Sequence, residues 1–353
     1  MGALWFVLVT LVLTVYILLD GFDLGVGIVY LLVSKNDDER RIALNAIGPI
    51  WSGNEVWLVM GGGILFLAFP KVYAAGLSGF YLGVFLLLWL LIGRGLSLEL
   101  RSQFDSPVWR TFWDTAFSVA NLALVIVLGV VWGNLLRGVP LNADGYFFTP
   151  FWTNWLPGGD AGLLDWYTIL TAVTAVVILG IYGATYLALR TNGQVRDRAT
   201  RLTLLGRWPA ALLAAGTVAA SVLIQPALRA SYGPRLYGLI LVFVALLGLL
   251  GIFYYGRRAE YADRNLGAAF VSTGLLILGL LSSTAFGLYP NLLVATTDGS
   301  YSLTIYNAAA APESLRVAVA WFVGGIALVI AYSIYSYRTF RGKVTPSSIE
   351  EGY

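Results

Sequence analysis

The sequence predicts an all-α, polytopic membrane protein, and three observations support this fold class. Of the 353 residues, 58% are hydrophobic and only 12% are charged, with a mean hydropathy of +0.78, whereas a soluble domain has about 25% charged residues. Apolar runs of roughly 20 residues, the length that crosses about 30 Å of hydrocarbon as a helix, recur along the chain. Runs such as 236–250 are apolar on every side, which excludes the alternating strands of a membrane β-barrel.

Nine apolar stretches are bounded by charged residues, proline or Gly-Asn pairs. They cover residues 3–33, 49–69, 76–98, 113–136, 165–189, 208–228, 236–255, 266–289 and 315–337. The first stretch is long, and we expect Gly21, Gly25 and Gly27 to let it bend. Since no linker suggests a separable soluble domain, residues 1–353 are predicted to form a single integral membrane domain.

The basic residues predict the orientation of the chain. Seventeen of the 22 Lys and Arg residues follow spans one, three, five and seven or lie in the C-terminal tail, and five lie on the opposite side. The positive-inside rule therefore places the C-terminus in the cytoplasm and the N-terminus outside. The first apolar run lacks a basic leader, so we expect it to be retained as a span. The net charge of +3 gives no sign of nucleic-acid binding.

The residues that usually hold metals are scarce. The chain has no histidine, no cysteine and only two methionines, Met1 and Met60. Haem is usually ligated by His, Met, Cys or Tyr, and copper and zinc sites depend on His and Cys. We therefore predict that this chain ligates neither a metal ion nor a haem, and that it has no catalytic residue of its own.

The segment 137–165 is the longest predicted outer loop and is rich in aromatic residues, Asn, Pro and Gly. It is interpreted either as an interfacial aromatic belt or as a binding site, and the sequence leaves both open.

Two carboxylates lie inside the first apolar span. Asp20 and Asp23 are three residues apart and share one helix face. A charge at the centre of a membrane helix costs about 2.5–3.5 kcal/mol, so its presence requires a reason. Because two like charges this close disfavour each other, one of the two could hold a proton at neutral pH, as a proton relay requires. The alternative is that both residues cap a bend or pair with arginines near the inner surface.

The second span begins with polar residues as well. Glu55 follows Asn54 about five residues into a run that has no further charge up to residue 69, and Ser52 is one helical turn before Glu55. We interpret Ser52, Asn54 and Glu55 as candidates for a proton path. Trp51 and Trp57 are either interfacial anchors or residues that line a path.

Charged residues near the ends of the third and fourth spans complete the set. Arg94 lies between two glycines and is expected to pair structurally, either with Glu99 or with the acids of the first span. Asp114 is expected to be a charge at the start of a helix, where it meets the positive end of the helix dipole.

The candidate residues of the first two spans belong to motifs that resemble subunit II of the cytochrome bd-type quinol oxidases, the haem-free subunit, including its cyanide-insensitive branch. The resemblance covers the whole chain in order, and residues 196–264 are its weakest part. The motifs are 20–27 (DGFDLGVG), 36–41 (NDDERR), 51–57 (WSGNEVW), 69–75 (FPKVYAA), 78–81 (SGFY), 133–140 (GNLLRGVP), 183–187 (GATYL) and 302–308 (SLTIYNA).

The resemblance implies a respiratory heterodimer in a bacterial or archaeal cytoplasmic (inner) membrane. Its partner, subunit I, would carry two b haems and one d haem, oxidise quinol and reduce oxygen. This chain would contribute two four-helix bundles and a peripheral helix, support assembly and proton uptake, and take part in oxygen access. The resemblance also allows a bound structural quinone and small single-span subunits.

The resemblance assigns roles to some of these positions. Asp23 matches a family acid associated with proton uptake, Asp20 matches its neighbour, and Trp57 matches a tryptophan near the oxygen entrance. The family pattern has an acid at position 52 and an amide at position 55, whereas this chain has Ser52 and Glu55. We hypothesise that the carboxylate has moved by one helical turn and still serves the path. We expect the face that carries Asp23 and Glu55 to meet the partner subunit.

A second function class is also compatible with these residues. Asp20, Asp23 and Glu55 could be the coupling-proton sites of a stand-alone secondary transporter. The sequence shows no inverted repeat of the kind that such transporters usually contain.

Overall fold

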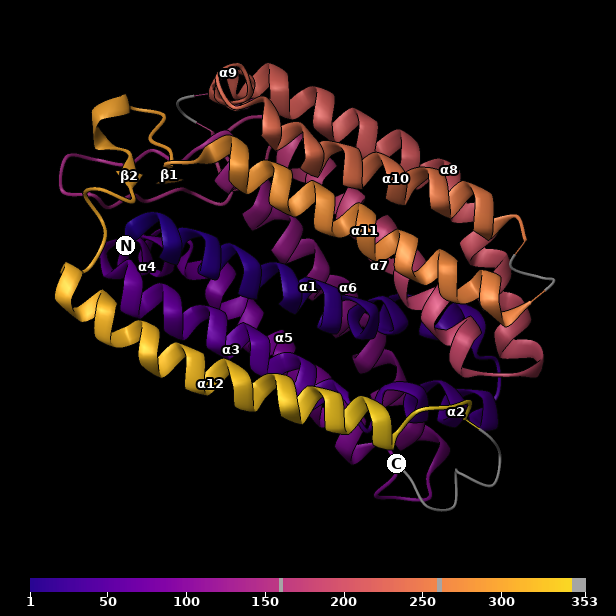
Figure 1. The fold of residues 1–353 in the computed structure, drawn as a ribbon. Helices are drawn as coiled ribbons and strands as arrows, with labels where there is room; N and C mark the ends of the chain where they lie inside the picture. The colour runs from indigo at the N-terminus through magenta and orange to yellow at the C-terminus, as the bar shows by residue number, and fades with distance from the viewer. Residues whose placement is uncertain (159–160, 259–261, 345–353) are drawn as a thin grey trace.

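The computed structural model describes residues 1–158, 161–258 and 262–344. Twelve α-helices form in this part of the chain, most of them running side by side along one axis (Figure 1). They are α1 (Gly2–Val33), α2 (Asp37–Ile47), α3 (Trp51–Ala68), α4 (Pro70–Gly79), α5 (Tyr81–Leu100), α6 (Pro107–Arg137), α7 (Trp166–Arg190), α8 (Gly193–Ile224), α9 (Pro226–Tyr232), α10 (Leu239–Gly256), α11 (Asp263–Leu288) and α12 (Pro312–Thr339).

The helices confirm the predicted all-α membrane fold. Among the described residues, eight helices are long and apolar enough to cross a membrane, and nine if the bent pair α2 and α3 counts as one span. The two helices of this pair meet at an angle of 46°. Two short strands, β1 (Asn291–Leu293) and β2 (Leu303–Thr304), pair antiparallel at the end of the bundle where the N-terminus lies (Figure 1).

Local sequence explains where several helices begin. The Asn36 side chain caps α2 by accepting a hydrogen bond from the Glu39 amide, and Asp165 forms a capping box at the start of α7. Prolines at the first turn of α4, α6, α9 and α12 suit positions that need no amide donor.

Two helices begin well before the predicted spans, because hydropathy marks only the apolar part of a helix, and the predicted span 76–98 is interrupted at Phe80 between α4 and α5. Helix α8 begins at Gly193 and not at residue 208, and α6 begins at Pro107 and not at residue 113. The first turns of α8 are polar, yet Val195, Ala199 and Thr203 are buried. The early part of α8 is therefore a helix that packs on one side before the apolar span starts.

Helix α1 runs through the middle of the molecule and is one unbroken helix (Figure 1). Its glycines mark close approaches to neighbours and do not interrupt it. A Cβ atom at Gly25 would lie 1.9 Å from the carbonyl oxygen of Leu179 in α7, and one at Gly27 would lie 2.2 Å from the Asn121 side chain in α6. The absence of a side chain at these positions lets the helix backbones touch.

The hydrophobic core has two main clusters that meet along α1. One includes Trp5, Tyr16, Trp57 and Phe69, and the other includes Phe22 and many residues of α7.

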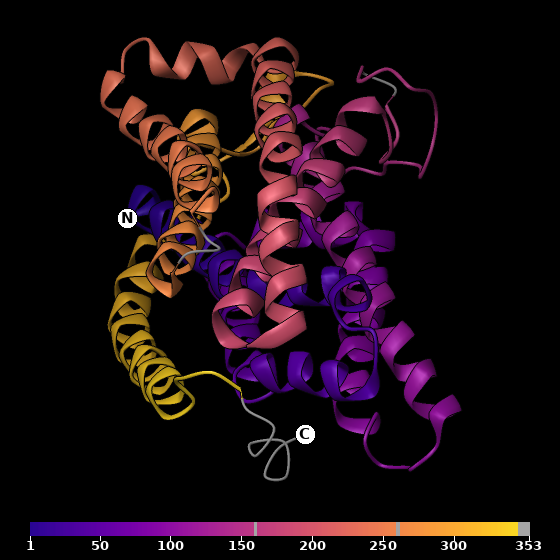
Figure 2. The same cartoon turned by 90° about the vertical axis from the view of Figure 1, so that its right-hand side faces the viewer.

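Helix α12 lies at the edge of the molecule against α3, as expected for a peripheral helix (Figure 1). In the view turned by 90°, it stands at the margin of the bundle with its outer side uncovered (Figure 2). The grouping of the remaining helices into two four-helix bundles stays a prediction, because α1 packs against α3 and α6 as well as against α7 and α11.

Candidate functional site

The acids of α1 meet a single arginine of α5 inside the helix bundle. The guanidinium of Arg94 binds Asp20 with two hydrogen bonds, from Nη2 to Oδ1 at 2.5 Å and from Nη1 to Oδ2 at 2.9 Å. Arg94 Nη2 also lies 4.0 Å from Asp23 Oδ2. All three side chains have 0% exposure. The sequence left two partners open for Arg94, and the structure selects the acids of the first span.

An asparagine of α3 links this ion cluster to the peripheral helix. Asn54 Nδ2 donates to Asp23 Oδ2 at 2.7 Å, and the hydroxyl of Tyr337 in α12 donates to Asn54 Oδ1 at 2.8 Å. Asp23 Oδ1 and Arg94 Nε are buried and have no hydrogen-bond partner among the described residues. The cluster thus holds one carboxylate oxygen that is free to accept or carry a proton.

The formal charges of this cluster do not cancel. Asp20 and Asp23 contribute two negative charges, and Arg94 supplies one positive charge. An uncompensated buried charge is strongly unfavourable. Because Asp20 forms a bidentate ion pair with Arg94, Asp23 is the member of the cluster whose charge is least compensated.

The remaining predicted residues of α3 lie around the cluster or away from it. Trp51 packs against the Arg94 guanidinium, 5.8 Å from the ring centroid, so it contributes to the cluster. Glu55 is half-buried at the margin, and Ser52 is exposed. Trp57 is buried in the core beside α1, and its Nε1 has no partner among the described residues.

One of the two partners that the sequence left open for Arg94 is not used, and one prediction from the sequence is wrong. Glu99 is exposed and makes no ion pair in the described part of the chain, so Arg94 pairs across helices and not along its own helix. Asp114 is not a charge at a helix start, because α6 begins at Pro107 and Asp114 lies two turns further in, where it is buried.

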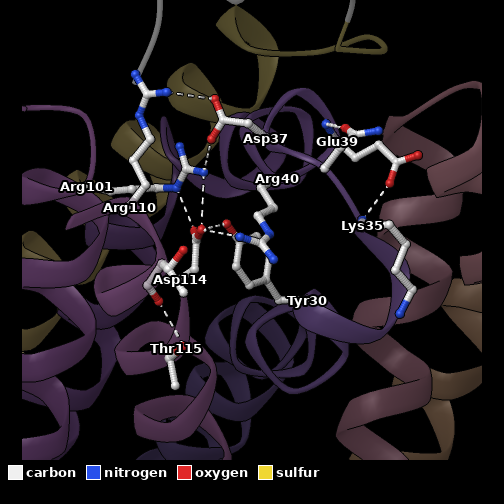
Figure 3. Close-up of polar contacts among 11 residues, drawn as sticks. Tyr30, Lys35, Asp37, Glu39, Arg40, Arg101, Arg110, Asp114 and Thr115 are labelled. Carbon is white, nitrogen blue, oxygen red and sulfur yellow. Dashed lines mark hydrogen bonds and ion pairs between the residues drawn. The ribbon is translucent and has the colours of Figure 1, made fainter. Parts of the chain in front are cut away.

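Asp114 instead anchors a second, larger set of ion pairs (Figure 3). It accepts hydrogen bonds from Arg101 Nε at 2.6 Å, from Arg40 Nη1 at 3.0 Å and from the hydroxyl of Tyr30. Asp37 accepts from Arg101 Nη2 at 2.7 Å and from Arg110 Nη1 at 3.3 Å. These contacts hold α1 and α2 against the hairpin formed by α5 and α6.

Sequence reasoning also missed a buried pair at the opposite end of the bundle. Arg137 binds Asp165, and its Nη2 donates to Asn134 Oδ1 at 2.7 Å. The guanidinium also donates to the carbonyl of Gly162 at 3.1 Å. The pair connects the loop between α6 and α7 to the ends of both helices. Asp165 could have been found as a helix cap from its position before α7, whereas its partner depends on the fold.

The donor set of this chain does not suit a haem or a metal ion. Without His or Cys, the usual strong ligands are missing. No group of three or more His, Cys, Asp or Glu side chains that could hold a metal ion occurs among residues 1–158, 161–258 and 262–344. The site described above is an ion cluster of two carboxylates and one guanidinium.

Fold and site together define a multi-span membrane protein in which two buried carboxylates meet a single buried arginine. The profile of one family, described as cytochrome bd terminal oxidase subunit II, matches residues 1–340. The chain belongs to this family and is a subunit of a bd-type quinol oxidase. This membership sets aside the interpretation as a stand-alone transporter.

Similar proteins agree with the family. The cytochrome bd ubiquinol oxidase subunit 2 of Bacillus subtilis is 31% identical, over 97% of this chain and 96% of that protein. The cytochrome bd-I ubiquinol oxidase subunit 2 of Escherichia coli K12 is also 31% identical, over 98% and 96%. In fold, the chain is similar to the bd oxidase from Geobacillus thermodenitrificans, with a TM-score of 0.71 and 19% identity over 96% of this chain and 98% of that chain.

Proposed function

We propose that this chain is the haem-free subunit of a quinol:oxygen oxidoreductase and that its buried ion cluster takes up protons from the cytoplasm. The haems would be ligated by the partner subunit, whose groups would carry electrons from quinol to oxygen. Protons released from quinol outside and taken up from inside would build a membrane potential without a pump. This chain would be inserted in a bacterial or archaeal cytoplasmic membrane with its C-terminus inside.

The observation that carries this proposal is the charge imbalance of Asp20, Asp23 and Arg94. A purely structural ion pair needs one carboxylate for one guanidinium, and here a second, fully buried carboxylate has an oxygen without a partner among the described residues. Such a group can exchange a proton while the Asp20–Arg94 pair stays intact. Asp23 lies 10 residues before the C-terminal end of α1 at Val33, about 15 Å along the helix axis, so it is within reach of the proposed cytoplasmic side.

One side of α3 is not covered by other helices of this chain, which supports the presence of a partner subunit on that side. Glu55 is half-buried on this side, and lipid tails could not solvate its carboxylate. We propose that the haem-bearing subunit covers it. Asp23 itself cannot face the partner, contrary to our expectation from the sequence, because Asn54 and Arg94 enclose it within this chain. Roles in oxygen access for Trp57, a bound quinone and small extra subunits stay predictions.

Replacing Asp23 by asparagine tests the proposal directly. The amide keeps the size of the side chain and leaves the neutral Asp20–Arg94 pair in place, but it cannot carry a proton. We expect the complex to assemble with its full haem spectrum and to consume oxygen at least about tenfold more slowly, since a positioned proton donor contributes that much or more. The matched control is Asp298→Asn, in an exposed turn at the other end of the molecule. Normal oxygen consumption by the assembled Asp23→Asn complex would refute the proton-uptake role.

Glu55→Gln tests whether the carboxylate at the margin of the cluster serves the same path. We expect oxygen consumption and the membrane potential to fall several-fold, a smaller effect than at Asp23, because Glu55 lies at the margin of the cluster and not within it. The control is Glu99→Gln, an exposed glutamate outside the cluster. If both quantities are unchanged in the assembled oxidase, Glu55 is not part of the path.

A further inference from the structure

Helix α12 is largely exposed, yet it is held against α3 at the level of the ion cluster. A Cβ atom added at Gly53 would lie 2.9 Å from the ring of Tyr332, so the two helices approach closely just beside Asn54. Further along α12, the Tyr337 hydroxyl reaches Asn54. The peripheral helix therefore contributes a polar group to a site that is otherwise built from α1, α3 and α5.

The hydrogen bond from Tyr337 determines how the Asn54 amide is used. An amide has an acceptor oxygen at one end and a donor nitrogen at the other. Because the oxygen accepts from Tyr337, the nitrogen is the end that faces Asp23. We propose that Tyr337 is a positioning residue that holds Asn54 as a donor to Asp23 Oδ2 and thereby directs the exchangeable proton to Oδ1. This inference rests on the proposed proton-uptake function.

The surroundings of Asp23 determine the effect of losing this hydrogen bond. The charged and titratable groups that face Asp23 are Asp20 of α1, Arg94 of α5, Glu55 of α3, Tyr182 and Tyr186 of α7, and Tyr337 itself. Without the Tyr337 hydroxyl, the Asn54 amide can turn and offer its oxygen to a protonated Asp23. The protonated state then gains an acceptor, and the proton is held more tightly.

The chain after α12 keeps Tyr337 in place. Arg190, at the end of α7, donates from Nη2 to the carbonyl of Phe340 at 2.5 Å, and its backbone carbonyl accepts from the amide of Val344 at 2.8 Å. Lys343 binds Asp263 at 2.7 Å, and Arg196 of α8 binds the same carboxylate at 2.7 Å. These contacts anchor residues 340–344 to α7 and α11.

The test is the pH dependence of oxygen consumption by the assembled oxidase carrying Tyr337→Phe. We expect a normal haem spectrum. We also expect the alkaline limb of the pH–rate profile to move to higher pH by about half a unit or more, the shift expected when one protonation state gains a hydrogen bond. The matched control is Tyr335→Phe, on the same helix but 68% exposed, which should leave the profile unchanged. A merely structural role would lower the rate without moving the limb.

Each outcome decides between the two proposals. If Asp23→Asn is slow and the Tyr337→Phe profile coincides with that of the unaltered protein, the positioning role is wrong and proton uptake stands. If Asp23→Asn is fully active, proton uptake itself is wrong, and the positioning role falls with it. If Tyr337→Phe does not assemble, Asn54→Ala is measured in its place, because it removes the amide that Tyr337 is proposed to hold as a donor to Asp23. An unshifted profile in that variant would overturn the positioning role.

Discussion

Arg94→Met is expected to prevent assembly of a stable oxidase complex. The substitution keeps most of the volume of the arginine stem and removes its charge, which leaves Asp20 and Asp23 fully buried beside each other without a cation. Removing one partner of a buried ion pair costs about 3–5 kcal/mol, a large share of the roughly 5–15 kcal/mol that stabilises a typical fold. The measurement is the yield and thermal stability of the purified complex, with its haem spectrum as the readout of the partner subunit.

Two comparisons make this result specific. Arg316→Met removes an exposed arginine of α12 and should leave stability unchanged. The double variant Arg94→Met with Asp20→Asn replaces the ion pair by neutral groups, so we expect it to recover part of the lost stability. If Arg94→Met alone assembles with normal thermal stability, the cluster does not hold α1 to α5.

Gly25→Val is expected to be as damaging, for a steric reason. At the crossing of α1 and α7, an added Cβ at Gly25 would overlap the carbonyl oxygen of Leu179, and one at Gly183 would lie 2.1 Å from the backbone of Gly25. Backbone atoms cannot rotate away as a side chain does, so the two helices must separate. We expect a loss of about 3 kcal/mol or more, at the upper end of the overpacking costs seen in cores.

The matched control for this prediction is Gly324→Val in α12, where an added Cβ meets nothing within 4 Å in this chain. The yield of folded protein and its thermal unfolding temperature are the measurements. A Gly25→Val protein as stable as the control would show that α1 and α7 do not cross as closely as the structure places them.

The all-α fold and the ionisable residues inside the spans could be predicted from the sequence, because both depend on local composition. A run of about 20 apolar residues is a span wherever it packs, and a charge within it is costly whatever its partner. Asp20 and Asp23 were identified in this way and Asn54 as the neighbour of Glu55, and the structure brings these three together with Arg94.

The boundaries of α6 and α8 were not predictable by the same method. The first turns of α8 are polar and those of α6 are interrupted by Arg110, so hydropathy does not mark them, although side chains such as Val195 pack on the inner side of the helix. The misplacement of Asp114 resulted from this error. A residue believed to open a helix was expected to meet the helix dipole, whereas inside the helix it meets Arg101 and Arg40.

The sequence by itself determined that this protein is a helical membrane subunit and that carboxylic acids lie within its apolar helices. It also predicted on which side of the membrane the basic loops lie. Only the tertiary structure decided that Arg94 pairs with Asp20 and not with Glu99, and that Tyr337 reaches Asn54 from 283 residues away. Hydropathy is a sum over neighbours in the chain. A side-chain partner instead depends on which helices touch and how each is rotated about its axis, and close contacts such as that between Gly25 and Gly183 determine this.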